Sequence, residues 1–310
     1  MVRRCADRQQ SLQNALSVYQ HNHGPLPGLT TQSATDTLIL QLIASLRRTE
    51  YISVLKSRKH SVDRLNPHHT MFDPITASHL LNRQGQLDEA VWLCFIATNF
   101  GKHSQDGWKL SANVYGSFGL GPVWTSTNYQ ANKQSFEQML LQNSAVLSDA
   151  SRAGRYSNHR QYVSRKPEAI AKTFDEMSQW LFANGSFSQL IRNVHVRSGQ
   201  NPEAAFDEMY RSVRQVNSFG RLGAFDFLTM IGKLDLAPIF PGSTYLDGAT
   251  GPLRGARLLF HGRTDFPRTG KQMQASFDLL DDYLQVGKQP LEDSICNWQK
   301  SPNVFVHFRG

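Results

Sequence analysis

The stretch LDEAVWLCFIATNF, residues 87–100, decides the fold class. It opens with the acidic pair Asp88 and Glu89, which suits the first turn of a helix because the positive end of the helix dipole lies there. Nearly every later residue is apolar, as in a helix that is buried on all sides. Gly101 then follows as an ordinary helix stop. The stretch therefore predicts a central, buried helix.

Apolar residues recur at helical spacing on both sides of this stretch. The further ranges with this pattern are 35–58, 132–150, 167–185, 201–216, 221–234, 271–286 and 290–300. Two of them also carry start signals, with Pro167 near one first turn and Asn201 followed by Pro202 at another. Alternating strands, a βαβ rhythm and glycine-rich nucleotide loops are absent from the sequence, which disfavours Rossmann and P-loop enzymes. We therefore predict an all-α fold.

The length of 310 residues allows one large domain or two. We expect residues 1–75 to form an N-terminal helical segment and residues 76–310 to form the main helical domain. A weak boundary lies near residues 150–166, where SDASRAGRYSNHRQYVSRKP interrupts the helical pattern. That segment is either a linker or, as its basic and aromatic content favours, part of a binding site.

The composition is that of a basic protein, with a formal net charge of +8 and a sequence pI of about 9.5. Such a charge favours a polyanionic partner, most often nucleic acid and less often an anionic membrane surface. The alternative is a basic protein without such a partner. Cys5, Cys94 and Cys296 form neither a disulfide framework nor a zinc motif. With no signal peptide and no long apolar run, we expect a reduced, cytoplasmic protein that does not enter a membrane.

The segment 152–172 combines cations with aromatic side chains. Tyr156, His159 and Tyr162 are interleaved with six basic residues, namely Arg152, Arg155, Arg160, Arg165, Lys166 and Lys172. Cations bind phosphates and aromatic faces stack on unpaired bases, so this pattern suits nucleic-acid binding. The amide of Asn158 has both a donor and an acceptor with which to read a base edge. A solvated basic loop is the alternative.

Asp226 is a carboxylate in an otherwise apolar helix. It stands between Phe225 and Phe227 and shares a helix face with Leu222 and Met230. A carboxylate in such surroundings needs a partner or a chemical role. In a functional role it is a general base or a group that stabilises a cationic transition state. In a structural role it is bonded to a helix N-terminus or to an arginine such as Arg221.

The stretch GATGPLRGARLLF, residues 248–260, predicts a glycine turn followed by a short helix. Free amides near Gly251 would point at an anion, with Arg254 and Arg257 close by. An ordinary turn before a packed helix is the alternative. Lys102, just after the buried helix, either ends that helix or reaches a phosphate. The histidine pairs in HNHG and HH lack matching acids or cysteines, so we expect surface loops and no metal site.

Four blocks together carry a family resemblance: LLNRQGQLDEAVWLCFIATNFGKH, GRYSNHRQYVS, SFGRLGAFDFLTMIGKL and GATGPLRGARLLF. From about residue 78 to residue 262 the chain resembles the alpha-glutamyl/putrescinyl thymine pyrophosphorylase family, clade three. The resemblance implies a role in DNA hypermodification and a relation to helix-hairpin-helix DNA glycosylases. Some members resemble antiviral glycosylases that remove modified bases from phage DNA.

The resemblance also implies roles for single residues. Asp226 would be the catalytic acid, with Asp265 as the other candidate because glycosylases of this type place that acid after the hairpin glycines. Asn158 and Arg160 would contact the extruded nucleotide, and further positions would hold substrate or DNA, namely Lys102, His159, Tyr162, Arg221, Lys233, Gly251, Arg254 and Arg257.

The expected function is a monofunctional DNA glycosylase acting on double-stranded phage DNA with modified pyrimidines, such as glucosylated hydroxymethylcytosine, without a cofactor. The alternatives are a transferase or pyrophosphorylase that hypermodifies thymine or another pyrimidine, and a non-catalytic DNA-binding module. Base release separates the first from the second, while binding that weakens with salt and yields no product marks the third.

Overall fold

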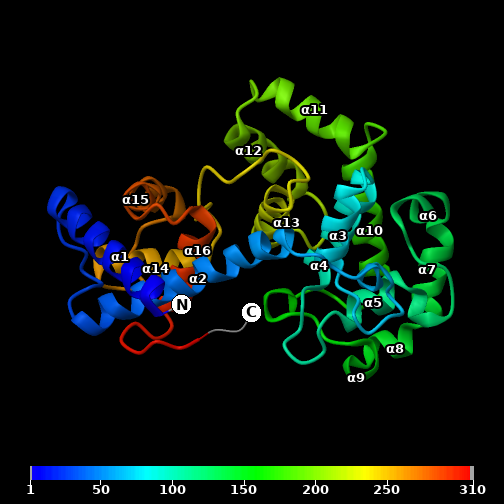
Figure 1. Cartoon of the computed structure of the whole chain (residues 1–310), viewed down its shortest axis with the longest axis horizontal. Coiled ribbons are helices and arrows are strands. Elements are labelled where there is room, and N and C mark those ends of the chain that lie inside the picture. Colours follow the sequence, from blue (N-terminus) through cyan, green and yellow to red (C-terminus); the bar gives the residue numbers. More distant parts are fainter. Residues whose placement is uncertain (1, 308–310) are drawn as a thin grey trace. The chain divides into compact units, whose positions relative to one another are not determined.

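The fold was taken from a computed structural model that describes residues 2–307, with side chains described from residue 6 onward. Within this range the chain is helical, and the only β-type pairing recorded is an isolated bridge between His103 and Gly107. Figure 1 shows the helices and confirms the all-α prediction. No helix in residues 2–307 has the length and apolar character needed to cross a bilayer.

The described residues form a series of α-helices. In chain order they are α1 (Val2–His23), α2 (Gln32–Ser57), α3 (Pro74–Arg83), α4 (Leu87–Phe100), α5 (Lys109–Tyr115), α6 (Ser126–Ala131), α7 (Lys133–Gln142), α8 (Ser144–Ser148), α9 (Ala150–Ala153), α10 (Pro167–Phe182), α11 (Phe187–Arg197), α12 (Pro202–Val213), α13 (Arg221–Lys233), α14 (Gly251–His261), α15 (Gly270–Leu284) and α16 (Lys288–Trp298). Three short 3-10 helices are η1 (Val62–Leu65), η2 (Ser117–Gly119) and η3 (Asn158–Arg160).

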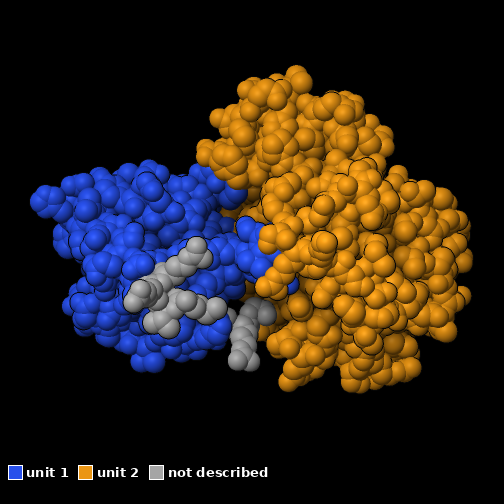
Figure 2. Space-filling view, viewed as in Figure 1, with its two compact units in different colours: residues 1–54, 241–309 blue, residues 55–240, 310 orange. Residues whose placement is uncertain are grey.

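The chain divides into two compact units, coloured in Figure 2. Unit 1 combines residues up to 54 with residues from 241 onward, and unit 2 spans residues 55–240. Both ends of the chain thus contribute to unit 1, whereas unit 2 is continuous in sequence. A boundary after residue 75, with each side folding separately, stays a prediction.

Helix α4 forms the centre of unit 2. Its residues from Ala90 to Ala97 are buried, which confirms the prediction of a buried helix. Trp92 and Phe95 both pack edge-on against Phe174 of α10, with ring centroids 5.4 and 4.9 Å apart. Such aromatic pairs add to the stabilisation that comes from apolar burial. The indole nitrogen of Trp92 donates to the carbonyl of Trp124 at 2.8 Å, so the one polar atom on this ring is satisfied.

The range 132–150 does not form the single helix that its pattern predicts. It contains α7, α8 and α9, which are separated at Asn143 and Asp149. The side chain of Asp149 accepts a bond from the amide of Ser151 at 2.9 Å and thereby starts a new helix. Asn and Asp compete with the helix for backbone hydrogen bonds, which is why they favour such breaks. The prediction of continuity was wrong for this physical reason.

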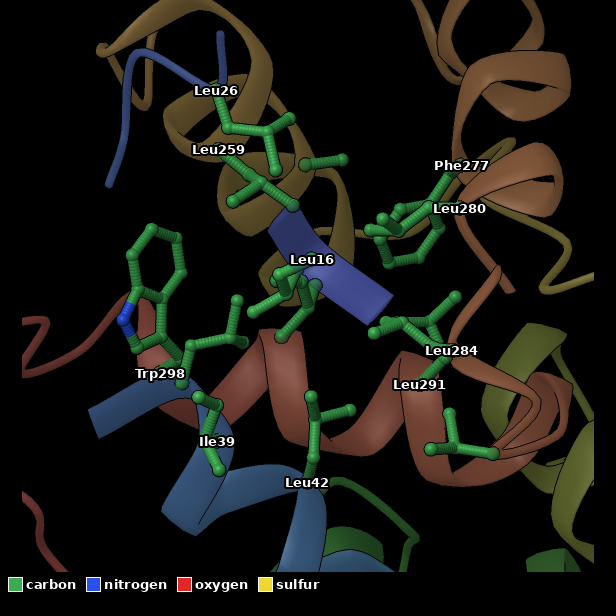
Figure 3. Packing of buried hydrophobic residues seen from close by; sticks show 14 of the residues in the cluster. Leu16, Leu26, Ile39, Leu42, Leu259, Phe277, Leu280, Leu284, Leu291 and Trp298 are labelled. Carbon is green, nitrogen blue, oxygen red and sulfur yellow. The ribbon is translucent and has the colours of Figure 1, made fainter. Parts of the chain in front are cut away.

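The core of unit 1 is apolar and comes from five helices. Figure 3 shows Leu16 of α1 among Leu259 of α14, Leu291 of α16 and Phe277 of α15, and α2 contributes Ile39 and Leu42. Full burial of each such side chain is worth about 1.5–3 kcal/mol. The indole of Trp298 donates to the carbonyl of Ala34 at 3.1 Å and ties α16 to the start of α2.

Candidate active site in unit 2

The basic segment 152–166 is anchored on the end of the buried helix. Most of it is irregular, with the single turn η3 in its middle. The amide of Ser157 donates to the carbonyl of Phe100 at 3.1 Å, so η3 begins next to the last turn of α4. This segment is therefore a fixed part of unit 2, which makes the linker interpretation unattractive.

Arg160 is the buried centre of this region, with a relative exposure of 2%. Its guanidinium donates to the carbonyl of Asn99 at 3.2 Å and to the carbonyl of Ser218 at 3.1 Å. A third bond goes to the phenol oxygen of Tyr162 at 2.8 Å. The guanidinium also lies 5.0 Å from the ring centre of Phe219. Burial lowers the pKa of Arg160, while Tyr162 and Asp226 act to raise it.

The ring of Tyr162 is exposed to solvent, while its hydroxyl accepts a hydrogen bond from Arg160. The residue is 61% exposed, and the Arg160 guanidinium lies 5.5 Å from its ring centre. Partial burial raises the pKa of Tyr162, Arg160 lowers it, and the charge of Asp226 raises it. An exposed aromatic ring that is fixed at its hydroxyl is a suitable platform for stacking, because little side-chain freedom remains to be lost.

Asp226 lies on α13 within electrostatic range of both Arg160 and Tyr162. It is half-buried, as are Leu222 and Met230 on the same helix face. One turn earlier, Gly223 packs directly against the Arg160 guanidinium. The site therefore combines a carboxylate, a phenol and partly exposed apolar side chains. The carboxylate of such a site can stabilise a positive charge or accept a proton from water.

The other predicted residues of unit 2 lie on η3, just after α4 and on α13. Asn158 and His159 are exposed on η3, and the Oδ1 atom of Asn158 accepts a bond from the side-chain amide of Gln161 at 2.7 Å. Lys102 is exposed, with its ammonium 5.8 Å from the ring centre of Trp108.

Arg221 and Lys233 lie at the two ends of α13, and both are half-buried. The guanidinium of Arg221 lies 6.0 Å from the ring centre of Phe225 on the same helix. The two cations thus flank the helix that carries Asp226.

Gly251, Arg254 and Arg257 belong to unit 1, on helix α14. Thr250 precedes this helix without capping it through its side chain. Arg254 is exposed, whereas Arg257 donates to the carbonyl of Arg268 at 2.8 Å and braces the next loop.

The two glycines of α14, Gly251 and Gly255, also have a packing role. A Cβ atom on Gly255 would lie 2.5 Å from the carbonyl oxygen of Ile295 on α16, and one on Gly251 would overlap the sulfur of Cys296. Both glycines therefore let α14 approach α16 closely. This packing role is independent of any anion binding by their backbone amides.

Asp265, the other candidate acid, is an exposed loop residue of unit 1. Its side chain is 73% exposed and pairs with Arg263 at 3.1 Å. That hydrogen bond lowers the pKa of Asp265.

Sequence reasoning missed the partners that hold the basic segment in place. Asp106 accepts three bonds from Arg155, from its amide at 2.9 Å, from Nε at 2.8 Å and from Nη2 at 2.6 Å. Arg165 is bonded to the carbonyls of Leu147 and Gly154. Several of the clustered arginines are thus structural braces. The sequence feature that could have indicated this bracing is Asp106 in the stretch GKHSQDG, shortly after the buried helix.

The described part of the chain also lacks a cluster of the kind that holds a metal ion. No group of three or more His, Cys, Asp or Glu side chains there could hold a metal ion.

Comparison with curated proteins and with solved structures returned no match. A family model does match, over residues 33–310, which extends well beyond the four blocks that carry the resemblance in the sequence. The description of that model is alpha-glutamyl/putrescinyl thymine pyrophosphorylase clade 3. Because the match covers most of the chain, the protein belongs to the alpha-glutamyl/putrescinyl thymine pyrophosphorylase family, clade 3.

Proposed function

We propose that this protein is a DNA glycosylase that excises a hypermodified pyrimidine, such as glucosylated hydroxymethylcytosine, from phage DNA in antiviral defence. The observation that carries the proposal is the half-buried carboxylate of Asp226 next to the exposed ring of Tyr162 and the buried Arg160. Membership of a family named for thymine modification supports DNA as the substrate. The net charge of +8 agrees with a polyanionic partner.

The proposed reaction is hydrolysis of the bond between the base nitrogen and the sugar carbon C1′. The target nucleotide leaves the base stack, at a cost of a few kcal/mol. As the bond breaks, its electron pair goes to the base and positive charge builds on the sugar, which Asp226 stabilises. A water oxygen bonds to C1′, and the proton it loses passes through Asp226 to the departing base. The products are a free base and an abasic site.

The neighbours of Asp226 have distinct proposed roles. Tyr162 stacks on the extruded base, and the exposed Asn158 and His159 contact the nucleotide from the same segment. Arg160 has three protein partners and almost no exposed surface, so we assign it the role of holding Tyr162 and balancing the charge of Asp226. It acts through these two residues and does not touch the substrate.

The remaining cations are proposed to bind the DNA backbone. Lys102, Arg221 and Lys233 serve this purpose in unit 2, and Arg254, Arg257 and the amides near Gly251 serve it in unit 1. A fold related to helix-hairpin-helix glycosylases, with residues 248–252 as the hairpin-like turn, is part of the same proposal.

Asp226 is a better candidate for the catalytic acid than Asp265. The side chain of Asp265 is 73% exposed, so water screens its charge and it would stabilise a nearby cation only weakly. Asp226 is half-buried and lies within electrostatic range of Tyr162, whose exposed ring suits a base. This comparison supports the choice of Asp226 from physical chemistry alone.

The alternative is a transferase or pyrophosphorylase that hypermodifies thymine or another pyrimidine in DNA. The family description favours it, because that description names a thymine pyrophosphorylase. Such an enzyme needs an activated base and an amine donor, and leaves the bond between base and sugar intact. The same carboxylate would then stabilise charge on the base substituent.

One experiment separates these two functions. The purified protein is incubated with unmodified, hydroxymethylated and glucosylated phage DNA, with and without amines. Free base and alkali-labile sites are then measured, and the bases left in the DNA are identified by mass spectrometry. Release from modified DNA supports the glycosylase. Altered bases without release, dependent on an amine, would replace it by the transferase, and no change in any DNA would contradict both.

A further inference from the structure

Unit 2 contains a cavity of about 580 Å³ that none of the proposed active-site residues lines. It lies between the loop that follows α5, helix α6 and helix α7. A volume of 300–1,000 Å³ is typical of sites for small organic ligands. The cavity is therefore large enough for a ligand of nucleoside size.

The walls of this cavity are uncharged and rich in carboxamides. Its twelve lining residues include no Asp, Glu, Lys, Arg or His, and five of them are the amides Asn128, Asn132, Gln138, Gln142 and Asn143. A phosphate or carboxylate ligand would leave its charge without a partner here, which is costly. The lining thus selects an uncharged ligand that offers both donors and acceptors.

Some of these carboxamides are hydrogen-bonded within the protein, while others can bond to a ligand. Asn128 donates to the carbonyl of Val123 at 2.9 Å and accepts from Asn132 at 2.8 Å, so these two are fixed in place. Gln138 and Gln142 are exposed, one turn apart on α7, and no side-chain partner is recorded for either within residues 2–307. Each can offer one N–H donor and one carbonyl acceptor in a single plane.

A buried donor without a partner lies in the same wall. Trp124 is 1% exposed, and its indole N–H has no hydrogen-bond partner among the described residues. Its backbone is well fixed, since its amide donates to the carbonyl of Tyr115 at 2.8 Å and its carbonyl accepts from Trp92. Because this N–H has almost no accessible surface, Trp124 contributes a fixed aromatic wall to the cavity and not a hydrogen bond to a ligand.

The loop at the rim is held in an unusual backbone conformation. Ser117 and Phe118 both have a φ of 54°, in the left-handed region that residues other than glycine rarely adopt. Such conformations persist only where the surroundings determine them. Here the hydroxyl of Ser117 donates to the carbonyl of Pro122 across the loop. This hydrogen bond supports the left-handed backbone at the rim.

We infer that this cavity binds an uncharged pyrimidine base or nucleoside as a second site, separate from Asp226. A pyrimidine edge presents a donor and acceptors side by side, which matches planar carboxamides. Leu120 and Met139 supply apolar surface for the faces of the ring. The inference does not depend on which bond the active site breaks.

The test is a titration of the full chain with thymidine and 2′-deoxycytidine, followed by NMR. The variants Gln138→Ala and Gln142→Ala should each weaken nucleoside binding about three- to tenfold, the usual effect of one lost neutral hydrogen bond. The matched control is Gln134→Ala, an exposed glutamine of α7 outside the cavity, which should leave the affinity unchanged. Affinity should also stay constant between 50 and 500 mM salt, because no ionic contact is involved.

Two further experiments test the location of the site and its preference for a base. Tyr162→Ala should leave nucleoside binding intact, and loss of binding in that variant would place the nucleoside at the active site and overturn the inference. Methyl glucoside serves as an uncharged ligand without a base. Binding of the glucoside alone, or no binding of either nucleoside at millimolar concentration, would overturn the assignment to pyrimidines.

Discussion

The guanidinium of Arg160 occupies the space in which a side chain on Gly223 would have to lie. A Cβ atom there would overlap Nη1 and would approach Cζ and Nη2 to 3.2 and 3.3 Å. The guanidinium cannot move away without giving up its bonds to Asn99 and Ser218. Helix α13 thus lies against the arginine one turn before Asp226, and this contact fixes how closely Arg160 approaches the helix that carries Asp226.

The substitution Gly223→Ala should therefore destabilise the protein and disturb the site together. Alanine gains about 1 kcal/mol in a helix interior, but overpacking costs about 1–3 kcal/mol and displaces a buried, hydrogen-bonded cation. We expect a net loss of up to about 2 kcal/mol in the free energy of unfolding, measured with urea, and slower base release. The control is Gly220→Ala, where a Cβ atom meets nothing within 4 Å. Equal effects at both positions would contradict the proposed contact.

The substitution Asp226→Asn should abolish catalysis and spare binding. Asparagine keeps the volume but loses the charge that opposes the developing cation, so we expect base release to slow about 10²- to 10⁴-fold. DNA affinity, measured by fluorescence anisotropy, should change little. Asp265→Asn is the matched control and should release base at the normal rate. If Asp226→Asn were fully active instead, the catalytic role would pass to Asp265 or to another residue.

Asp106 should make stability depend on pH in the acid range. Hydrogen bonds from Arg155 lower the pKa of Asp106 from the usual 3.8. An acid with a lowered folded-state pKa stabilises the fold above its unfolded pKa, and this contribution is lost as the pH falls through the folded-state value. Asp106→Asn should thus be less stable than wild type at pH 7, and the difference should shrink below about pH 4.

Urea unfolding of both proteins at a series of pH values measures this difference. Asp149→Asn makes a useful comparison, since the pKa of Asp149 is lowered by local bonds to Ser151 and not by an arginine from a distant segment. A constant difference between wild type and Asp106→Asn from pH 7 down to pH 2 would contradict the prediction.

The sequence predicted several helices closely because periodicity and caps are local signals. The bounds of α4 match the expected range 87–100, and α13 differs from 221–234 by one residue. The role of Arg160 was not accessible in the same way. Its partners Asn99 and Ser218 are 61 and 58 residues away, and only the folded chain brings them together. Composition therefore drew attention to the basic segment, but it could not separate cations that brace the fold from cations that face solvent.

The segment GPLRGA gives a last prediction, because its packing and its proposed DNA contact lie on neighbouring residues. A Cβ atom on Gly255 would come within 2.5 Å of the Ile295 carbonyl oxygen and 2.8 Å of its side chain. Gly255→Ala should therefore force α14 away from α16 and lower the free energy of unfolding by about 1–3 kcal/mol, as measured with urea.

The neighbouring substitution Arg254→Ala is the control, since Arg254 is exposed. It should leave stability within about 0.5 kcal/mol of wild type. If Arg254 binds a phosphate, DNA affinity should fall for all sequences alike, and the slope of log affinity against log salt should drop by about one. Loss of stability in Arg254→Ala with an unchanged salt slope would remove this helix from the proposed DNA-binding surface and leave packing as the reason for its glycines.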